Sequence, residues 1–255
     1  MARSLLVLSG GHPYEEGPFA ELLAALGDWQ VTHLVHPEGG EADAADAITR
    51  ADALLFYDMA GYTFAEGAVA TRPPSPAFRA AIAARFASGK GAVAMHHALA
   101  GWAEWPEWHN WLGGQFHYQP GQHGPDSGYR HDVAYEARVT ADHPVTRGLP
   151  QSFPVTDELY LCPVDEAAIA PLVRAEGFAF TADNFYSAAN AVAGAMFSRE
   201  GWDHPKGSDC IAWESRKCPA PLIYLQCGDG PATYSNPHVQ RMIANALDYT
   251  SGGMP

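Results

Sequence analysis

The first hundred residues alternate between short apolar segments and amphipathic segments, and this alternation limits the folds that the chain can adopt. Four apolar segments have the length of buried strands: residues 5–8, 30–35, 53–57 and 91–95. Helical patterns separate them, at residues 19–26, 42–50 and 76–86. Strands that alternate with helices in this way predict an α/β fold, a doubly wound and mostly parallel sheet with right-handed crossovers.

The middle of the chain follows a different pattern. Mixed periods between residues 113 and 199 predict a cap-like insertion, an additional and partly antiparallel segment over the ligand end of the sheet, with four strands at residues 132–140, 155–161, 172–175 and 191–197. The first pattern then returns with strands at 210–213 and 222–226 and a helix from about Pro237. Since no linker divides the chain, we expect one domain over residues 1–255.

Charge and composition exclude several classes of partner. The chain carries 15 Lys and Arg against 29 Asp and Glu, a net charge of −14. Such a chain repels phosphate backbones and anionic lipid surfaces, which disfavours nucleic acid and membranes as partners, whereas a neutral sugar is compatible with it. No run of 18 apolar residues is present, and we expect a cytoplasmic protein. The four cysteines include no C-x-x-C pair. Assembly into a homo-oligomer is also compatible with the sequence.

Histidines stand where the strands of such a sheet end. His96 and His97 directly follow the strand at 91–95, His12 follows the first strand, and His117 lies beyond the next helix. Ligands of α/β sheets gather at the carboxyl ends of the strands. Because neighbouring residues of an extended chain point to opposite sides, we expect no more than one of His96 and His97 to enter the cleft directly.

Two acids and a phenol stand together at residues 157–160. In a strand, Glu158 and Tyr160 share a face while Asp157 turns away. Glu158 with a raised pKa would serve as a general acid or base; a buried structural carboxylate is the alternative.

Tryptophans at steps of three follow the histidine pair: Trp102, Trp105, Trp108 and Trp111. They form either a core stripe or a platform on which sugar rings stack, with Trp102 as a substrate-binding residue.

A metal site is a further hypothesis. No cofactor is required by the sequence, but His96, His97, His117 and Glu158 are candidate ligands for a divalent metal such as zinc. The chain contains no H-x-H or H-E-x-x-H spacing, so the motif alone does not decide the question.

Several segments in order resemble the ThuA-like (trehalose utilisation) family of the class I glutamine amidotransferase-like superfamily. They are Leu8-Ser-Gly-Gly-His-Pro-Tyr14, Ala94-Met-His-His97, Leu112-Gly-Gly-Gln-Phe-His117, Asp142-His-Pro-Val-Thr-Arg-Gly-Leu149, Thr156-Asp-Glu-Leu-Tyr160 and Cys227-Gly-Asp229 with Asn236-Pro237. The resemblance implies a flavodoxin-like core and a role in sugar metabolism. Histidines replace the nucleophilic cysteine of true amidotransferases, and Gly228 stands where the family commonly has a histidine.

These observations lead to one main hypothesis and two alternatives. The main one is an enzyme that hydrolyses, eliminates from or isomerises a sugar or keto-sugar, with acid–base groups among His96, His97, His117 and Glu158. Substrate would be bound or oriented by His12, Tyr160, Asp229 and Trp102. The alternatives are a non-catalytic carbohydrate-binding or regulatory protein, which the Gly228 departure favours, and a thiol-dependent amidase built on Cys227.

Overall fold

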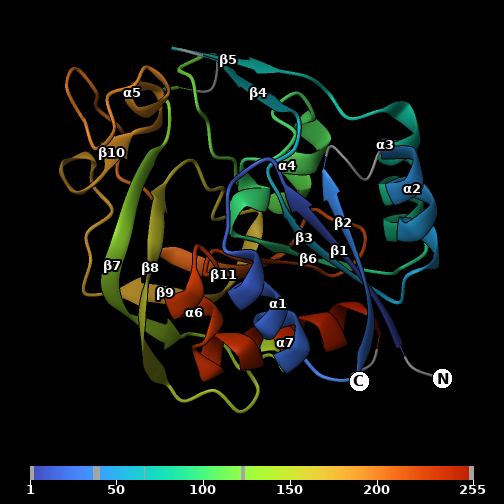
Figure 1. Cartoon of the computed structure of the whole chain (residues 1–255). Coiled ribbons are helices and arrows are strands. Elements are labelled where there is room, and N and C mark those ends of the chain that lie inside the picture. The colour runs from blue at the N-terminus through green and yellow to red at the C-terminus, as the bar shows by residue number, and fades with distance from the viewer. Residues whose placement is uncertain (1–2, 37–40, 66, 122–123, 253–255) are drawn as a thin grey trace.

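A parallel sheet forms one half of the molecule, and its strand order is that of flavodoxin-like folds. In the computed structural model, which describes residues 3–36, 41–65, 67–121 and 124–252, the order is β2-β1-β3-β6-β12. These strands are β1 (Arg3–Gly10), β2 (Trp29–His36), β3 (Ala53–Asp58), β6 (Ala92–Met95) and β12 (Leu222–Leu225). The doubly wound α/β architecture predicted from the sequence is confirmed (Figure 1).

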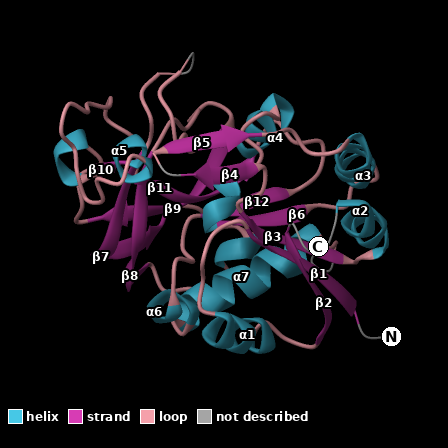
Figure 2. Cartoon of the chain, turned by 45° about the horizontal axis from the view of Figure 1, so that its top comes forward, coloured by secondary structure: helices cyan, strands magenta, loops and turns pink. Residues whose placement is uncertain are grey.

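Helices cover both faces of this sheet, as Figure 2 shows. The helices are α1 (Glu16–Ala25), α2 (Glu41–Arg50), α3 (Pro76–Ala87), α4 (Pro106–Leu112), α5 (Ala188–Val192), α6 (Pro231–Tyr234) and α7 (Pro237–Thr250). One core cluster packs α1 and α7 against Leu5 and Val7 of β1; the other packs α2 and α3 against Leu6 and Leu8. Alternate residues of one apolar strand therefore supply both cores. No helix in the described ranges is long and apolar enough to cross a membrane.

The rest of the sheet is antiparallel. It consists of β11 (Cys210–Ser215), β9 (Ile169–Glu176), β7 (Gly128–Val139), β8 (Ser152–Leu161) and the short β10 (Tyr186–Ser187). β11 joins β12, β9 joins β11, and β7 joins β9. The middle segment thus continues the main sheet rather than forming a separate layer, and β7 and β8 lie side by side at its edge (Figure 1).

The prediction of a strand at residues 191–197 is wrong. Residues 188–192 form α5, because Ser187 caps the helix by accepting a hydrogen bond from the Asn190 amide and the alanine-rich sequence favours a helix. The chain then turns and reaches Phe197 with a φ of 60°. A separate hairpin of β4 (Tyr62–Ala65) and β5 (Ala68–Thr71) also forms, which the sequence analysis did not predict.

The tryptophan stripe belongs to the core. All four indoles are buried, and Trp102 is only 2% exposed, packed against Phe78 and His36. A sugar ring cannot stack on a buried indole, so the interpretation of this segment as a carbohydrate platform, with Trp102 as a substrate-binding residue, is wrong.

Candidate active site

A cavity of about 300 Å³ lies at the carboxyl ends of the strands. Its polar lining comes from three places: His12 in the loop after β1, His131 on β7, and Glu158 and Tyr160 on β8. Its volume falls within the range of small-molecule sites in proteins. The cavity is therefore the candidate active site.

The loop that carries His12 depends on Gly11. Gly11 has a φ of 77°, and a Cβ atom there would lie 2.1 Å from the carbonyl oxygen of Met59. Glycine alone fits this close approach, which lets the loop turn over the end of β3. His12 Nδ1 lies 2.8 Å from the Pro13 carbonyl oxygen, which can only accept, so Nδ1 carries the proton and Nε2 has the lone pair.

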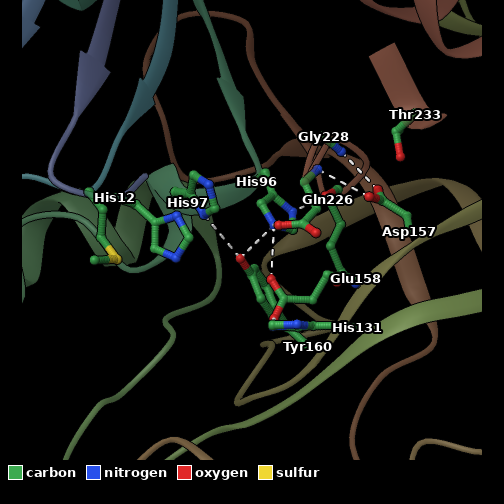
Figure 3. A network of polar contacts seen from close by, with 12 residues as sticks. His12, His96, His97, His131, Asp157, Glu158, Tyr160, Gln226, Gly228 and Thr233 are labelled. Carbon is green, nitrogen blue, oxygen red and sulfur yellow. Dashed lines mark hydrogen bonds and ion pairs between the residues drawn. The ribbon is translucent and has the colours of Figure 1, made fainter. Parts of the chain in front are cut away.

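His96 and His97 lie behind the cavity rather than in it. They belong to the 3₁₀ turn η1 (His96–Leu99) and are almost fully buried. His96 has a φ of 47°, which breaks the extended alternation, and both rings contact the Tyr160 hydroxyl (Figure 3). We expected no more than one of them to enter the cleft directly, and neither lines the cavity. His96 contacts Glu158 of the lining, and His97 contacts the His12 ring.

His96 is held as an imidazolium. Its Nδ1 donates to the Gln226 carbonyl oxygen at 2.6 Å, and its Nε2 lies 3.1 Å from Glu158 and 2.8 Å from the Tyr160 hydroxyl. Burial alone would lower the pKa of His96, but the contacts with Asp229 and Glu158 outweigh burial and raise that pKa to about 10. His96 Nε2–H therefore donates, and the proton of the Tyr160 hydroxyl remains available to other acceptors.

Glu158 is a carboxylate, contrary to the expected raised pKa. Burial favours the neutral acid, but hydrogen bonds with His131 and His96 lower the pKa of Glu158 to about 2. Its role is to hold protons on its two histidine neighbours rather than to exchange its own. As predicted, Glu158 and Tyr160 share one face of β8, while Asp157 points to the other side and accepts from the amides of Gly228 and Asp229 (Figure 3).

The sequence analysis missed His131. A β-bulge between Arg130 and Val133 places two residues of β7 opposite Glu158, and His131 Nε2 lies 3.0 Å from the Glu158 carboxylate. The contact with Glu158 raises the pKa of His131 although burial opposes it. The predicted strand began one residue later, at 132, and nothing in the local pattern indicates a bulge.

The pKa values of His12 and His97 are lowered, in contrast to those of His96 and His131. Burial lowers the pKa of His12, and burial together with the nearby His96 and His12 lowers the pKa of His97 well below 6.5. Their rings lie 4.0 Å apart, centroid to centroid. The site therefore combines two histidines whose pKa is lowered with two whose pKa is raised.

The remaining predicted residues lie further away. His117 is half-buried and lines two other hollows instead of this cavity. Asp229 Oδ1 is 3.6 Å from His96 Nε2, close enough to stabilise its charge. Cys227 is buried, and burial raises the pKa of its thiol to about 12, so a thiolate nucleophile for amidase chemistry is absent at neutral pH.

Three residues bring metal-ligating atoms together. Ligand atoms of His96, His97 and Asp229 lie within 4.8 Å of one another in the part of the chain that the structure describes. This set shares two residues with the predicted one, but it contains Asp229 instead of His117 and Glu158. A cation bound there would have to displace the proton from His96 Nε2, because Nδ1 already donates to Gln226.

Comparisons with known proteins show the family to which the chain belongs. A sequence model of the ThuA family, described as trehalose utilisation, matches residues 5–250. The chain belongs to the ThuA family. This membership connects the chain with carbohydrate metabolism. A search of the curated proteins found no match.

Solved structures show the same fold at low identity. A putative ThuA-like protein from Parabacteroides merdae is 14% identical with a TM-score of 0.70, covering 99% of this chain and 91% of that one. A putative ThuA-like protein from Bacteroides uniformis is 18% identical with a TM-score of 0.62, covering 97% and 91%. A putative GMP synthase protein from Thermoplasma acidophilum is 8% identical with a TM-score of 0.52, covering 99% and 96%. This ThuA-family chain thus shares its fold with two putative ThuA-like proteins and with the putative GMP synthase subunit.

Proposed function

We propose that this ThuA-family protein is an enzyme that moves a proton at the carbon next to the carbonyl group of a keto-sugar. The observation that carries the proposal is the pairing of two histidines on the wall of one cavity: His12, whose pKa is lowered by burial, and His131, whose pKa is raised by its contact with Glu158 at 3.0 Å. Titratable groups whose surroundings push their pKa values apart are a feature of acid–base sites.

Each group has a role that follows from its hydrogen bonds. His12 Nε2, which has the lone pair, removes the proton from the carbon beside the carbonyl. Tyr160 donates its hydroxyl hydrogen to the carbonyl oxygen, because that hydroxyl already accepts from the His96 imidazolium. The electron pair from the broken C–H bond then forms an enolate, whose oxygen accepts the hydrogen bond of the Tyr160 hydroxyl.

His131 completes the reaction as the acid. In an elimination, the electron pair of the enolate re-forms the carbonyl group and expels the oxygen substituent on the neighbouring carbon, and His131 protonates that oxygen as it leaves. The Glu158 carboxylate offsets the positive charge of the histidines, since it holds His131 protonated before the step and pairs with His96 throughout. Isomerisation uses the same first step and returns the proton elsewhere.

The test measures proton removal directly. Purified protein is incubated with a 3-keto disaccharide in D₂O, and deuterium at the carbons beside the carbonyl is followed by NMR. We expect exchange or product formation with the native protein and a loss of about 10²–10⁴-fold in the His12→Gln variant. The matched control is His238→Gln on α7, whose ring packs on Phe153 outside the cavity.

Other results would support other functions. Binding of disaccharides without exchange or turnover would favour the non-catalytic carbohydrate-binding protein. A second candidate, metal-assisted chemistry on the same substrate class, is favoured by the clustering of His96, His97 and Asp229. A divalent ion there would polarise the carbonyl oxygen in place of Tyr160.

A further inference from the structure

The outer part of the cavity differs from its polar floor. Glu158 and Tyr160 are buried and form the floor, while half-buried His12 and exposed His131 complete the polar wall. The mouth is lined by the exposed Phe64 of β4 on one side and by residues of α5 and the following turn on the other. The latter residues are Ala188, Ala191, Val192 and Met196. The β4–β5 hairpin and α5 lie near each other at the same end of the molecule (Figures 1 and 2).

Large apolar side chains are concentrated at this mouth. Among the described residues, four large hydrophobic side chains are exposed, and three of them are Phe64, Met196 and Phe197. The Phe197 ring lies 5.8 Å from the His131 ring, so it stands beside the proposed acid. Phe197 has a φ of 60°, an unfavourable conformation for a bulky residue, and its amide donates to the Tyr129 hydroxyl at 2.9 Å. That hydrogen bond holds the backbone of Phe197 in this conformation.

The tyrosines of the outer walls present rings rather than hydroxyl groups. The Tyr129 hydroxyl is occupied by the Phe197 amide, and the Tyr118 hydroxyl donates to Met59 Sδ at 3.2 Å. Both rings still line the cavity. A second sugar ring at this position would leave hydroxyl groups without protein partners as it displaced water, which is unfavourable.

We propose that the reacting sugar carries an apolar, ring-containing substituent, rather than a second sugar, and that this substituent packs between Phe64 and Met196. This inference rests on the proposed function for the position of the sugar, which lies on the polar floor. The apolar group would then leave through the mouth after His131 protonates its oxygen.

The experiment compares binding of unreactive, unoxidised ligands by calorimetry, so that it does not depend on turnover. The probes are 2-phenylethyl glucoside in both anomeric forms, methyl glucoside and trehalose. We expect the preferred phenylethyl anomer to bind about tenfold more tightly than trehalose, because the ring removes apolar surface from water. Phe64→Ser and Met196→Ser should each lower that preference about fivefold.

Val31→Ser provides the matched control, because Val31 is an exposed apolar residue on β2 that does not line the cavity. The Val31→Ser variant should prefer the phenylethyl glucoside over trehalose as strongly as the native protein does. Equal or tighter binding of trehalose would overturn the proposal, as would an unchanged preference in Phe64→Ser. The proposal would also be overturned if Phe64→Ser or Met196→Ser changed the sedimentation coefficient of the protein but not its ligand preference. The mouth would then be an interface between copies of the chain. The D₂O exchange test fails or succeeds independently of these outcomes.

Discussion

Replacement of Glu158 by glutamine removes the charge at the centre of the site while keeping its shape. The carboxylate lies 3.1 Å from His96 Nε2 and 3.0 Å from His131 Nε2. Although burial opposes the charged form, these two histidines lower the pKa of Glu158 from 4.5 to about 2. At about 1.36 kcal/mol per pKa unit, that difference is worth about 3 kcal/mol of folding stability at pH 7.

The pH dependence follows from the direction of the change. A pKa that is depressed in the folded state stabilises the protein above the unfolded-state pKa, near 4.5, and the stabilisation is lost as the pH falls towards 2. We therefore expect Glu158→Gln to lower the free energy of unfolding by about 3 kcal/mol at pH 7 and by about half of that at pH 3.

Urea unfolding followed by tryptophan fluorescence at the two pH values measures both differences. Glu21→Gln on α1 is the control, because Glu21 is an exposed acid outside the cavity. Its free energy of unfolding should change by less than about 0.5 kcal/mol. An equal loss at pH 7 and pH 3 in Glu158→Gln would refute the reasoning, since the effect would then come from packing rather than charge.

Three further predictions concern the same site. The value of kcat/KM should be highest at the pH values where His12 is neutral and His131 is protonated, a plateau that extends below and above pH 6.5. In Glu158→Gln, the loss of kcat/KM on the alkaline side of this plateau should begin at lower pH, because His131 loses the contact that raises its pKa. Chelators should leave activity unchanged while added Zn²⁺ inhibits, because a cation would displace the proton of His96 Nε2; loss of activity on chelation, together with stoichiometric metal in the untagged protein, would instead establish the metal-assisted mechanism. Gly228→Ala should lower the free energy of unfolding by about 1–3 kcal/mol in a urea titration, because Gly228 has a φ of 149° and the added Cβ would lie 3.0 Å from Met95 Cε; an unchanged midpoint would contradict this.

The parallel half of the fold was predictable because its signals are local. Apolar runs of strand length identify β1, β3 and β6, and the hydroxyl of Ser75 caps α3 as the Ser-Pro pair indicates, by accepting from the Phe78 amide. The face that Glu158 and Tyr160 share also follows from strand alternation alone. These features depend only on neighbours in sequence.

The features that the sequence did not predict depend on contacts between distant segments. The helix α5 is held by Asp126, which accepts hydrogen bonds from the Ser187 hydroxyl and the Ala189 amide, some sixty residues along the chain. The turn at His96 requires a positive φ, which periodicity cannot reveal. The exclusion of His117 from the cavity follows from the path of the loop after α4, where Phe116 lines the cavity and His117 does not.

The two histidines with a raised pKa share one carboxylate, and Asp229 adds to the effect at His96. Glu158 contacts the imidazoles of His96 and His131, and the pKa of each is raised. His12 and His97 have no hydrogen bond to Glu158 among the described residues, and burial lowers the pKa of each. Contact with Glu158 therefore separates acid from base among four side chains of the same type. Since the bulge in β7 decides whether His131 reaches that carboxylate, a local irregularity of the strand determines which histidine acts as the acid.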